Sequence, residues 1–284
     1  MSLMDTFTRP IEALYNTSRI PAGFHSHLYY ELYYFHSGQC SYLVGDRIYN
    51  LSPGDLLLMN GMTLHYPKIN PAFEYCRTIV HFDPAYAEGL FRAPFHTPVL
   101  NPFKRTDNRL ISLEPGERAI LEPLLEELCS LSGESDSLCR DRFLASFMRV
   151  LLQVYEIADK PRNRSHEPAG PRQQHVQQLI SYMEAHYTED LRLDDIAAAV
   201  HLNKHYLVKM FKETTGITLF HYLYRRRINQ AKVLFTLEPQ KSITETAYEV
   251  GFKHLSHFSQ TFKKFTGLTA DEYRKEVLNT YSKE

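Results

Sequence analysis

The pattern of apolar and polar residues indicates strands in the first part of the chain. From about residue 24 to residue 82 the sequence is rich in Tyr, Phe, Val and Ile, and it alternates in stretches such as Ser41-Tyr42-Leu43-Val44. Turn-forming pairs such as Ser37-Gly38, Gly45-Asp46 and Asn60-Gly61 divide this part into short segments. Short aromatic-rich strands at this turn spacing predict an all-β sandwich or barrel.

A helical pattern replaces the alternation from about residue 114 to residue 157. Apolar residues recur there at spacings of three and four, which places them on one face of a helix. The second helix is apolar over a wide arc, so we expect the two helices to be either core or a surface that meets a second subunit. The apolar positions are Leu121, Leu124, Leu125 and Leu128 in one segment and Phe143, Phe147, Val150, Leu151 and Val154 in the next.

Residues 159–171, DKPRNRSHEPAGP, separate these helices from the rest of the chain. Three prolines, one glycine and many polar residues are typical of a linker. The remainder of the chain has a helical pattern. We therefore predict a multi-domain protein: an all-β sandwich or barrel over residues 1–110, helices that form core or a dimer surface over 111–158, and an all-α domain over 172–284.

Composition and charge exclude several classes of protein. The 284 residues are 43% apolar and 23% charged, which is ordinary for a globular protein and excludes disordered and fibrous chains. No apolar run approaches the roughly 18–20 residues of a membrane helix, and the first residues show no signal peptide. We expect a cytoplasmic protein with no membrane partner. The four cysteines fit no zinc spacing, so we expect free thiols.

The last third of the chain contains an internal repeat. Residues 196–218 and 246–269 align at an offset of 51 residues over most of their length. The part from residue 172 onward has 16 Lys and Arg against 13 Asp and Glu, a mildly basic balance that is compatible with a polyanionic partner. The matched pairs are Phe211-Lys212 with Phe262-Lys263 and Thr215-Gly216 with Thr266-Gly267.

Each copy of the repeat predicts a helix, a tight turn and a second helix. Asn203 is a good N-cap for one second helix, and Ser242 with Glu245 forms a capping box at the start of the other copy. This is the helix-turn-helix arrangement, whose second helix enters the major groove of DNA. The basic run Arg225-Arg226-Arg227 between the copies favours the same interpretation over a helical bundle without a partner.

The segment GFKHLSHFSQTFKKFTGLTADEYR, the first copy and the connecting stretch YLYRRRINQAKVLF resemble the C-terminal signature of AraC-type (AraC/XylS) transcription regulators. The resemblance covers about residues 172–278. It implies two helix-turn-helix units, joined by a long helix, that bind successive major grooves of double-stranded DNA. By position it implies base contacts from His205, Val208, Lys209, Leu255, Ser256, Ser259 and Gln260, and phosphate contacts from Lys212 and Lys263.

Two residues depart from the family pattern. Ala270 stands where the family usually has proline, and His254 stands where a stronger N-cap is common. The second copy also has no Arg or Lys at its candidate base-reading positions. We therefore expect the second copy to read bases weakly and to bind DNA mainly through backbone contacts.

The N-terminal domain contains a motif with metal-ligand chemistry. His25, His27 and Glu31, followed by Gly38, have the spacing HxH-x3-E-x6-G, and His65 comes further along the chain. Alternate residues of a strand share a face, so the first two histidines can point the same way. Three imidazoles and one carboxylate suit a divalent transition metal. The stretch resembles the cupin motifs, in which these four positions bind metal in many enzymes. This resemblance implies that residues 1–110 form a cupin-like barrel, which in AraC-type proteins senses an effector.

Three uses of this motif stay open. The residues could bind a metal, line an effector pocket or have purely structural roles, and the AraC-type resemblance implies a barrel that needs no metal cofactor. Tyrosines suit hydrogen bonding and stacking to a sugar or a similar polar molecule. His36 and His81 are expected to be ordinary surface or core residues. The ligand-binding candidates are His25, His27, Glu31, Tyr33, Tyr42 and His65.

The leading interpretation is a DNA-binding transcription regulator, not an enzyme, whose barrel senses a small molecule. The family resemblance suggests sugar or carbon metabolism as the source of that molecule, activation as the common mode, and a homodimer. RNA polymerase is a further candidate partner. The alternative is a metal-dependent cupin enzyme with an appended DNA-binding module, and a regulator that needs no effector is also compatible with the sequence.

Overall fold

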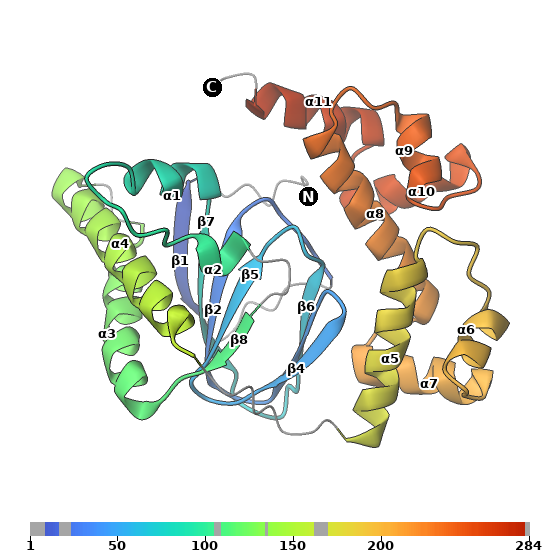
Figure 1. Ribbon diagram of the computed structural model, residues 1–284, viewed down its shortest axis with the longest axis horizontal. Coiled ribbons are helices and arrows are strands. Elements are labelled where there is room, and N and C mark those ends of the chain that lie inside the picture. The colour runs from blue at the N-terminus through green and yellow to red at the C-terminus, as the bar shows by residue number, and fades with distance from the viewer. Residues whose placement is uncertain (1–8, 17–23, 105–108, 134–135, 162–169, 282–284) are drawn as a thin grey trace. The chain divides into compact units, whose positions relative to one another are not determined.

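The computed structural model describes residues 9–16, 24–104, 109–133, 136–161 and 170–281. The chain forms two compact units: among the described residues, one comprises those up to residue 44 and from 49 to 161, and the other comprises residues 170–281 together with residues 45–48. Residues 162–169 of the predicted linker lie outside the described residues. The predicted fold class is confirmed: a sheet-rich N-terminal domain is followed by helices and then by an all-α C-terminal domain (Figure 1).

The strands described in the N-terminal unit form a five-stranded sheet of order β1-β7-β2-β5-β8 and a three-stranded sheet of order β4-β3-β6 (Figure 1). The pairs β1–β7, β2–β7, β2–β5, β5–β8 and β3–β6 are antiparallel. The strands are β1 (Ile11–Asn16), β2 (Tyr30–Ser37), β3 (Cys40–Val44), β4 (Arg47–Leu51), β5 (Asp55–Asn60), β6 (His65–Ile69), β7 (Cys76–Phe82) and β8 (Arg109–Ser112).

The larger sheet is buried on both faces. In β2, Leu32 and Tyr34 point to one face and join a hydrophobic cluster that includes the helices after the sheet. Tyr33 and Phe35 point to the other face and join a cluster with residues of the smaller sheet. Because a strand that is covered on both sides needs no polar face, β2 and β5 are nearly continuous runs of aromatic and aliphatic residues.

Four helices accompany the sheets: α1 (Pro84–Leu90), α2 (Asn101–Lys104), α3 (Pro115–Leu131) and α4 (Ser137–Asp159) are those among the described residues of this unit. The apolar stripes of α3 and α4 pack on the larger sheet and are part of its core. Strand β8 ends at Ser112, two residues beyond the predicted end of the barrel at residue 110. Leu138 and Leu152 of α4 stay exposed. The four cysteines, all among the described residues, form no disulfide.

The C-terminal unit is helical throughout its described residues. Five of the residues that the sequence places on the inner faces of the second helices are buried: Leu207, Met210 and Phe211 in the first copy, and Phe258 and Phe262 in the second. Phe265, the third residue expected on the inner face of the second copy, is only partly buried and packs against that core. The helices are α5 (Pro171–His186), α6 (Leu193–Ala199), α7 (Lys204–Thr215), α8 (Leu219–Leu237), α9 (Ile243–Glu249), α10 (Leu255–Thr266) and α11 (Ala270–Tyr281).

The predicted helix ends are confirmed. The side chain of Asn203 accepts hydrogen bonds from two backbone amides at the start of α7, and Ser242 and Glu245 form the capping box of α9. Gly216 and Gly267 end α7 and α10 in the left-handed conformation, with φ of 84° and 80°. This conformation costs glycine little because it has no Cβ.

The arginine run that the sequence places between the copies is largely occupied in contacts within the domain. Only 6% of the surface of Arg227 is exposed, and Arg226 forms an ion pair with Glu184 of α5, Nε to Oε2 2.5 Å. The run lies inside α8, where successive side chains point about 100° apart and cannot share one face. These arginines hold the fold together.

No helix among the described residues has both the length and the apolar character that crossing a bilayer requires.

Candidate functional site

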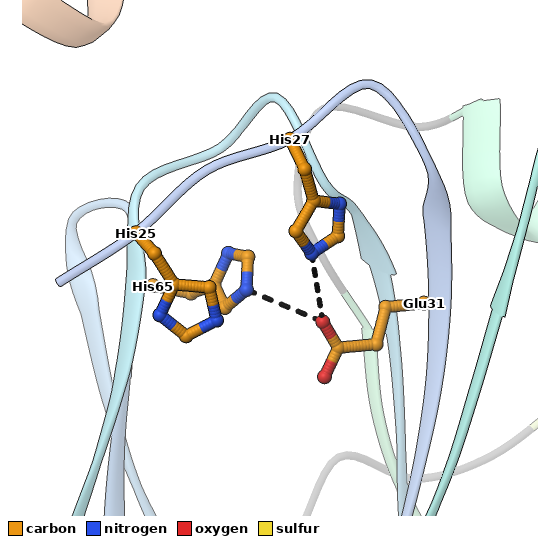
Figure 2. A group of neighbouring side chains, drawn as sticks. All are labelled: His25, His27, Glu31 and His65. Carbon is orange, nitrogen blue, oxygen red and sulfur yellow. Dashed lines mark hydrogen bonds and ion pairs between the residues drawn. The ribbon is translucent and has the colours of Figure 1, made fainter. Parts of the chain in front are cut away.

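The four metal-ligand candidates of the N-terminal unit come together where β2 and β6 begin (Figure 2). We call His25, His27, Glu31 and His65 the histidine cluster; one ligand-type atom of each lies within 4.8 Å of those of the others. A backbone bridge holds His25 beside His65, with both N···O distances 3.0 Å. The structure therefore assembles residues that are separated by up to 40 positions in the sequence.

Backbone carbonyls fix the orientation of two of the imidazoles. Nδ1 of His65 lies 2.8 Å from the carbonyl oxygen of Thr63, and Nδ1 of His27 lies 3.1 Å from that of Tyr29. A carbonyl oxygen only accepts hydrogen bonds, so each Nδ1 carries the proton. In the neutral ring, Nε2 then presents a lone pair. This is the arrangement that orients histidines as metal ligands.

Both Nε2 atoms face the same carboxylate oxygen. Oε2 of Glu31 lies 3.3 Å from Nε2 of His27 and 3.2 Å from Nε2 of His65 (Figure 2). Glu31 and His65 are buried, with 1% and 0% of the side chain exposed. Two lone pairs aimed at a carboxylate repel it unless a proton or a metal cation lies between them.

Burial and neighbouring charges act in opposite directions on these groups. Burial raises the pKa of Glu31, but the nearby imidazoles of His81 and His65 hold that pKa well below its usual value. Burial lowers the pKa of His27 to about 4, against the opposing effect of the Glu31 carboxylate beside it. The cluster therefore combines an ionised carboxylate with a neutral His27 near pH 7.

Gly61 makes room for His27. The backbone of His27 donates to the carbonyl oxygen of Gly61 at 2.8 Å, and the amide of Gly61 donates to that of Tyr29 at 3.1 Å. A Cβ at Gly61 would overlap both the ring of His27 and the carbonyl oxygen of Tyr29. The glycine that the sequence marks as a turn residue is thus also part of the site.

His81 is a neighbour of the cluster that sequence reasoning missed. It was expected to be an ordinary surface or core residue, but its Nε2 lies 3.2 Å from Oε2 of Glu31. Residue 81 in β7 pairs directly with residue 31 in β2. Alternation places His81 on the same face as Arg77 and Ile79, but only the pairing of β2 with β7, which is distant in sequence, brings it to Glu31.

The two candidate tyrosines lie deeper between the sheets. Tyr33 and Tyr42 are 0% and 1% exposed, and their ring centroids are 4.8 Å apart. The hydroxyl of Tyr33 is 2.5 Å from that of Tyr75. The ring of Tyr42 stacks at 6.3 Å on that of His65, which connects the tyrosines to the histidine cluster. The predicted ligand-binding set is therefore contiguous.

The outer face of α7 has the predicted chemistry. His205, Lys209 and Lys212 are exposed and Val208 is partly buried. Lys209 and Lys212 form no ion pair with any residue in the described part of the chain, whereas Lys204 pairs with Asp194 at 3.0 Å. A groove of about 680 Å³ follows this face, lined by Leu193, Asp194, Lys204, His205, Val208, Lys209, Lys212, Glu213 and Gly216.

The corresponding face of α10 is exposed but less basic. Its five candidates, all exposed, are Leu255, Ser256, Ser259, Gln260 and Lys263. The side chain of His254 makes no hydrogen bond at the start of this helix, in agreement with its expected weakness as an N-cap. Ala270, the residue in place of the family's proline, is buried and begins α11.

Comparisons with known proteins match both units. A model of the AraC-like ligand binding domain matches residues 8–152, just over half of the chain, and a helix-turn-helix domain model matches residues 196–276, which span both copies of the repeat. The structure of ToxT from Vibrio cholerae aligns with 94% of this chain and 98% of its own, at 17% identity and a TM-score of 0.35.

Two curated relatives each match part of the chain. An uncharacterized HTH-type transcriptional regulator in the cgkA 5′ region of Pseudoalteromonas carrageenovora is 39% identical over 100 residues, 35% of this chain and 58% of that protein. The melibiose operon regulatory protein of Escherichia coli K12 is 29% identical over 153 residues, 53% of this chain and 50% of that protein. The chain thus spans about half the length of these relatives. From the family models over its two units, the chain belongs to the AraC family of transcription regulators.

Proposed function

We propose that the protein is a sequence-specific DNA-binding transcription regulator. The observation that carries this proposal is the pair of helix-turn-helix copies, each with a buried inner face and an exposed polar outer face on its second helix. Helices α7 and α10 enter major grooves of the duplex. The base-reading residues are His205, Val208, Lys209, Leu255, Ser256, Ser259 and Gln260, and Lys212 and Lys263 bind phosphates.

DNA binding by the full chain tests this proposal. Fluorescence anisotropy with a labelled duplex at several salt concentrations should show affinity that falls steeply with salt, because neutralised phosphates release counterions. Lys209→Ala should weaken binding, whereas Lys275→Ala, the same charge change on α11 outside both copies, should have little effect. Absence of binding at low salt would refute the proposed function.

We also propose that the N-terminal unit senses a small, polar, sugar-like molecule and does not catalyse a reaction. The buried tyrosines beside the histidine cluster support this, as does the name of the relative that regulates a melibiose operon. A homodimer, cytoplasmic location and contact with RNA polymerase complete the proposal. A thermal-shift screen of sugars against the full chain tests it, with Tyr42→Phe as the variant that should lose a response.

A second proposal concerns a metal ion at the histidine cluster. The two imidazoles with protonated Nδ1 atoms point bare Nε2 atoms at one carboxylate, and this donor set of three nitrogens and an oxygen fits a divalent transition metal. When bound, the ion would offer a charged anchor for an oxygen of the effector. His25, His27, Glu31 and His65 would hold it, and Gly61 keeps His27 in position.

Metal content of the purified full chain decides this second proposal. We expect about one equivalent of a transition metal after dialysis against Zn²⁺ or Ni²⁺, lost in His65→Ala. The matched control is His36→Ala, because His36 lies in the same strand as Glu31 but bonds to Thr78, 2.8 Å away. Equal metal content in the two variants would contradict the site.

A further inference from the structure

The loop between α5 and α6 receives a buried arginine from the helix that connects the two copies. Arg227 of α8 donates from Nε to the carbonyl oxygen of Tyr187 and from a terminal nitrogen to that of Glu189, both at 2.6 Å. Its guanidinium also lies 5.8 Å from the ring centroids of Tyr224 and Phe252. A planar guanidinium holds two carbonyls in a fixed geometry through separate nitrogens, whereas an ammonium donates from one nitrogen whose donors rotate.

The turn of the second copy lies against the same loop. Gly251 has a φ of 94°, and a Cβ there would come within 2.6 Å of the carbonyl oxygen of Thr188 and 2.8 Å of its Cα. Lys253, two residues later, forms an ion pair with Asp190. We call these contacts of Arg227, Gly251 and Lys253 with the α5–α6 loop the joint.

The joint connects the two helix-turn-helix copies at a second place, in addition to the helix α8 between them. The loop belongs to the first copy, because it leads directly into α6, whereas Gly251 and Lys253 form the turn of the second. Without it, the copies would be connected mainly through α8, a helix of 19 residues that is about 28 Å long. A single connecting helix sets the distance between the copies, but a second contact is needed to fix the rotation of one copy relative to the other about the axis of that helix.

The turn of the first copy has an exposed residue other than glycine at the equivalent position. His201 occupies the position of Gly251 at an offset of 50 residues, is exposed, and carries a full side chain in a left-handed conformation with φ of 53°. Glycine is therefore required in the second turn by the close approach of another backbone as well as by the dihedral angle. The asymmetry between the turns marks the second as a contact surface between the copies.

We propose that the joint fixes the angle and separation of α7 and α10, and so determines which spacing between two DNA segments the protein accepts. This inference rests on the proposed DNA binding. Arg227 is thus a positioning residue that selects DNA without touching it. One inserted base pair moves the second segment by about 3.4 Å and rotates it by about 34°. A rigid pair of helices cannot follow that change.

Selection from a random DNA library tests the inference, because it finds the bound sequences and their spacing together. The full chain should enrich pairs of segments at one spacing, and one inserted base pair should weaken binding about tenfold, as a misplaced base contact does. Arg227→Lys keeps the charge but loses the rigid two-nitrogen geometry that holds both carbonyls, so it should enrich several spacings and lose less than about threefold on the same insertion. A single unchanged spacing would overturn the inference.

Arg274→Lys is the matched control. Arg274 donates to the carbonyl oxygen of Lys241 at 3.1 Å, a contact that lies outside the joint. This variant should keep the wild-type spacing even if its melting temperature falls as much as that of Arg227→Lys. If both variants broaden the spacing equally, loss of stability explains the effect and the joint has no special role.

A measurement without DNA separates this inference from the proposed function. Spin labels at Glu213→Cys and Lys264→Cys, equivalent exposed positions on α7 and α10, report the distance between the two helices in the full chain. Cys129 and Cys139 are replaced by serine for this purpose, since Cys40 and Cys76 are buried. Arg227→Lys should broaden the distance distribution. An unchanged distribution would refute the joint even if the protein binds DNA.

Discussion

The two helix-turn-helix copies share their cores but differ on their surfaces. Phe211 and Phe262 occupy the same buried position, and Thr215 and Thr266 donate through Oγ1 to the carbonyl of the residue four positions earlier, at 2.8 and 2.6 Å. The outer faces have no such agreement: Lys209 in one copy corresponds to Gln260 in the other. The two copies agree at the buried positions that both need in order to fold, and they differ at the exposed positions of the second helix.

The copies also differ at the entrance to the second helix. Asn203 caps α7 with its side chain, whereas His254 stands at the same place before α10 without a side-chain hydrogen bond. The turn before it contains His201 in one copy and Gly251 in the other. The first copy thus combines a well-capped helix with a strained turn, and the second combines a poorly capped helix with an unstrained turn.

The largest expected effect tests whether α7 reads bases more strongly than α10. Lys209→Ala should lower affinity for the selected DNA about tenfold to a hundredfold and relax preference at one position, because a good base contact contributes about 1–3 kcal/mol. Gln260→Ala and Ser256→Ala should each change affinity less than about fivefold, since α10 presents no cation to bases. Anisotropy titrations with matched and mutated duplexes measure both.

Equal losses of DNA affinity from the substitutions on α7 and on α10 would contradict the prediction that α7 reads bases more strongly. A large effect of Gln260→Ala on sequence preference would mean that its amide reads a base in the manner of other amide contacts to adenine. In that outcome the two copies would be equivalent readers despite their different charge.

We expect the two copies to contribute equally to phosphate binding. Lys212→Ala and Lys263→Ala remove lysines at equivalent exposed positions, so each should reduce the slope of log affinity against log salt by about 0.9 without altering sequence preference. Titrations at four or more salt concentrations determine the slopes. A reduced slope for only one variant would show that only one copy approaches the DNA backbone at this position.

Local patterns in the sequence predicted most of this unit. The apolar spacing in α7 and α10, the cap at Asn203 and the terminal glycines depend on neighbours within a few residues, and all are as expected. The role of Arg227 could not be predicted in this way, because its partners Tyr187 and Glu189 are about 40 positions away. A run of arginines suggests a basic surface unless the helix phase and the location of those carbonyls are known.

The histidine cluster shows the same contrast between features that depend on nearby residues and features that depend on residues distant in the sequence. The spacing of His25, His27 and Glu31 places them near one another on a single segment, so the sequence suffices to propose them. His81 reaches Glu31 only through the register between β2 and β7, which no local pattern specifies. The double burial of the larger sheet similarly depends on α3 and α4 covering its outer face.

Substitutions at the two N-cap positions should change the free energy of unfolding in opposite directions. Asn203→Ala should destabilise the protein by about 1 kcal/mol, because two amides at the start of α7 lose their acceptor. His254→Asn should stabilise it by about 0.5–1 kcal/mol, since the backbone there is already extended, with φ of −135° and ψ of 126°. Urea denaturation followed by circular dichroism measures both. Destabilisation by His254→Asn would mean that the histidine has another role.

The smallest expected effect concerns the turn of the first copy. His201 is exposed and has a φ of 53°, a region that costs an ordinary residue about 1–2 kcal/mol and glycine almost nothing. His201→Gly should therefore stabilise the protein, by less than about 1 kcal/mol, because glycine also gains entropy in the unfolded chain. Gly251→Ala should have the opposite sign, since its Cβ would press on the backbone of Thr188. Paired urea titrations of the two variants measure this difference. If His201→Gly destabilised the protein, the histidine side chain would have to make a contact in solution that outweighs the relief of backbone strain, and the turns would be less different than their dihedral angles indicate.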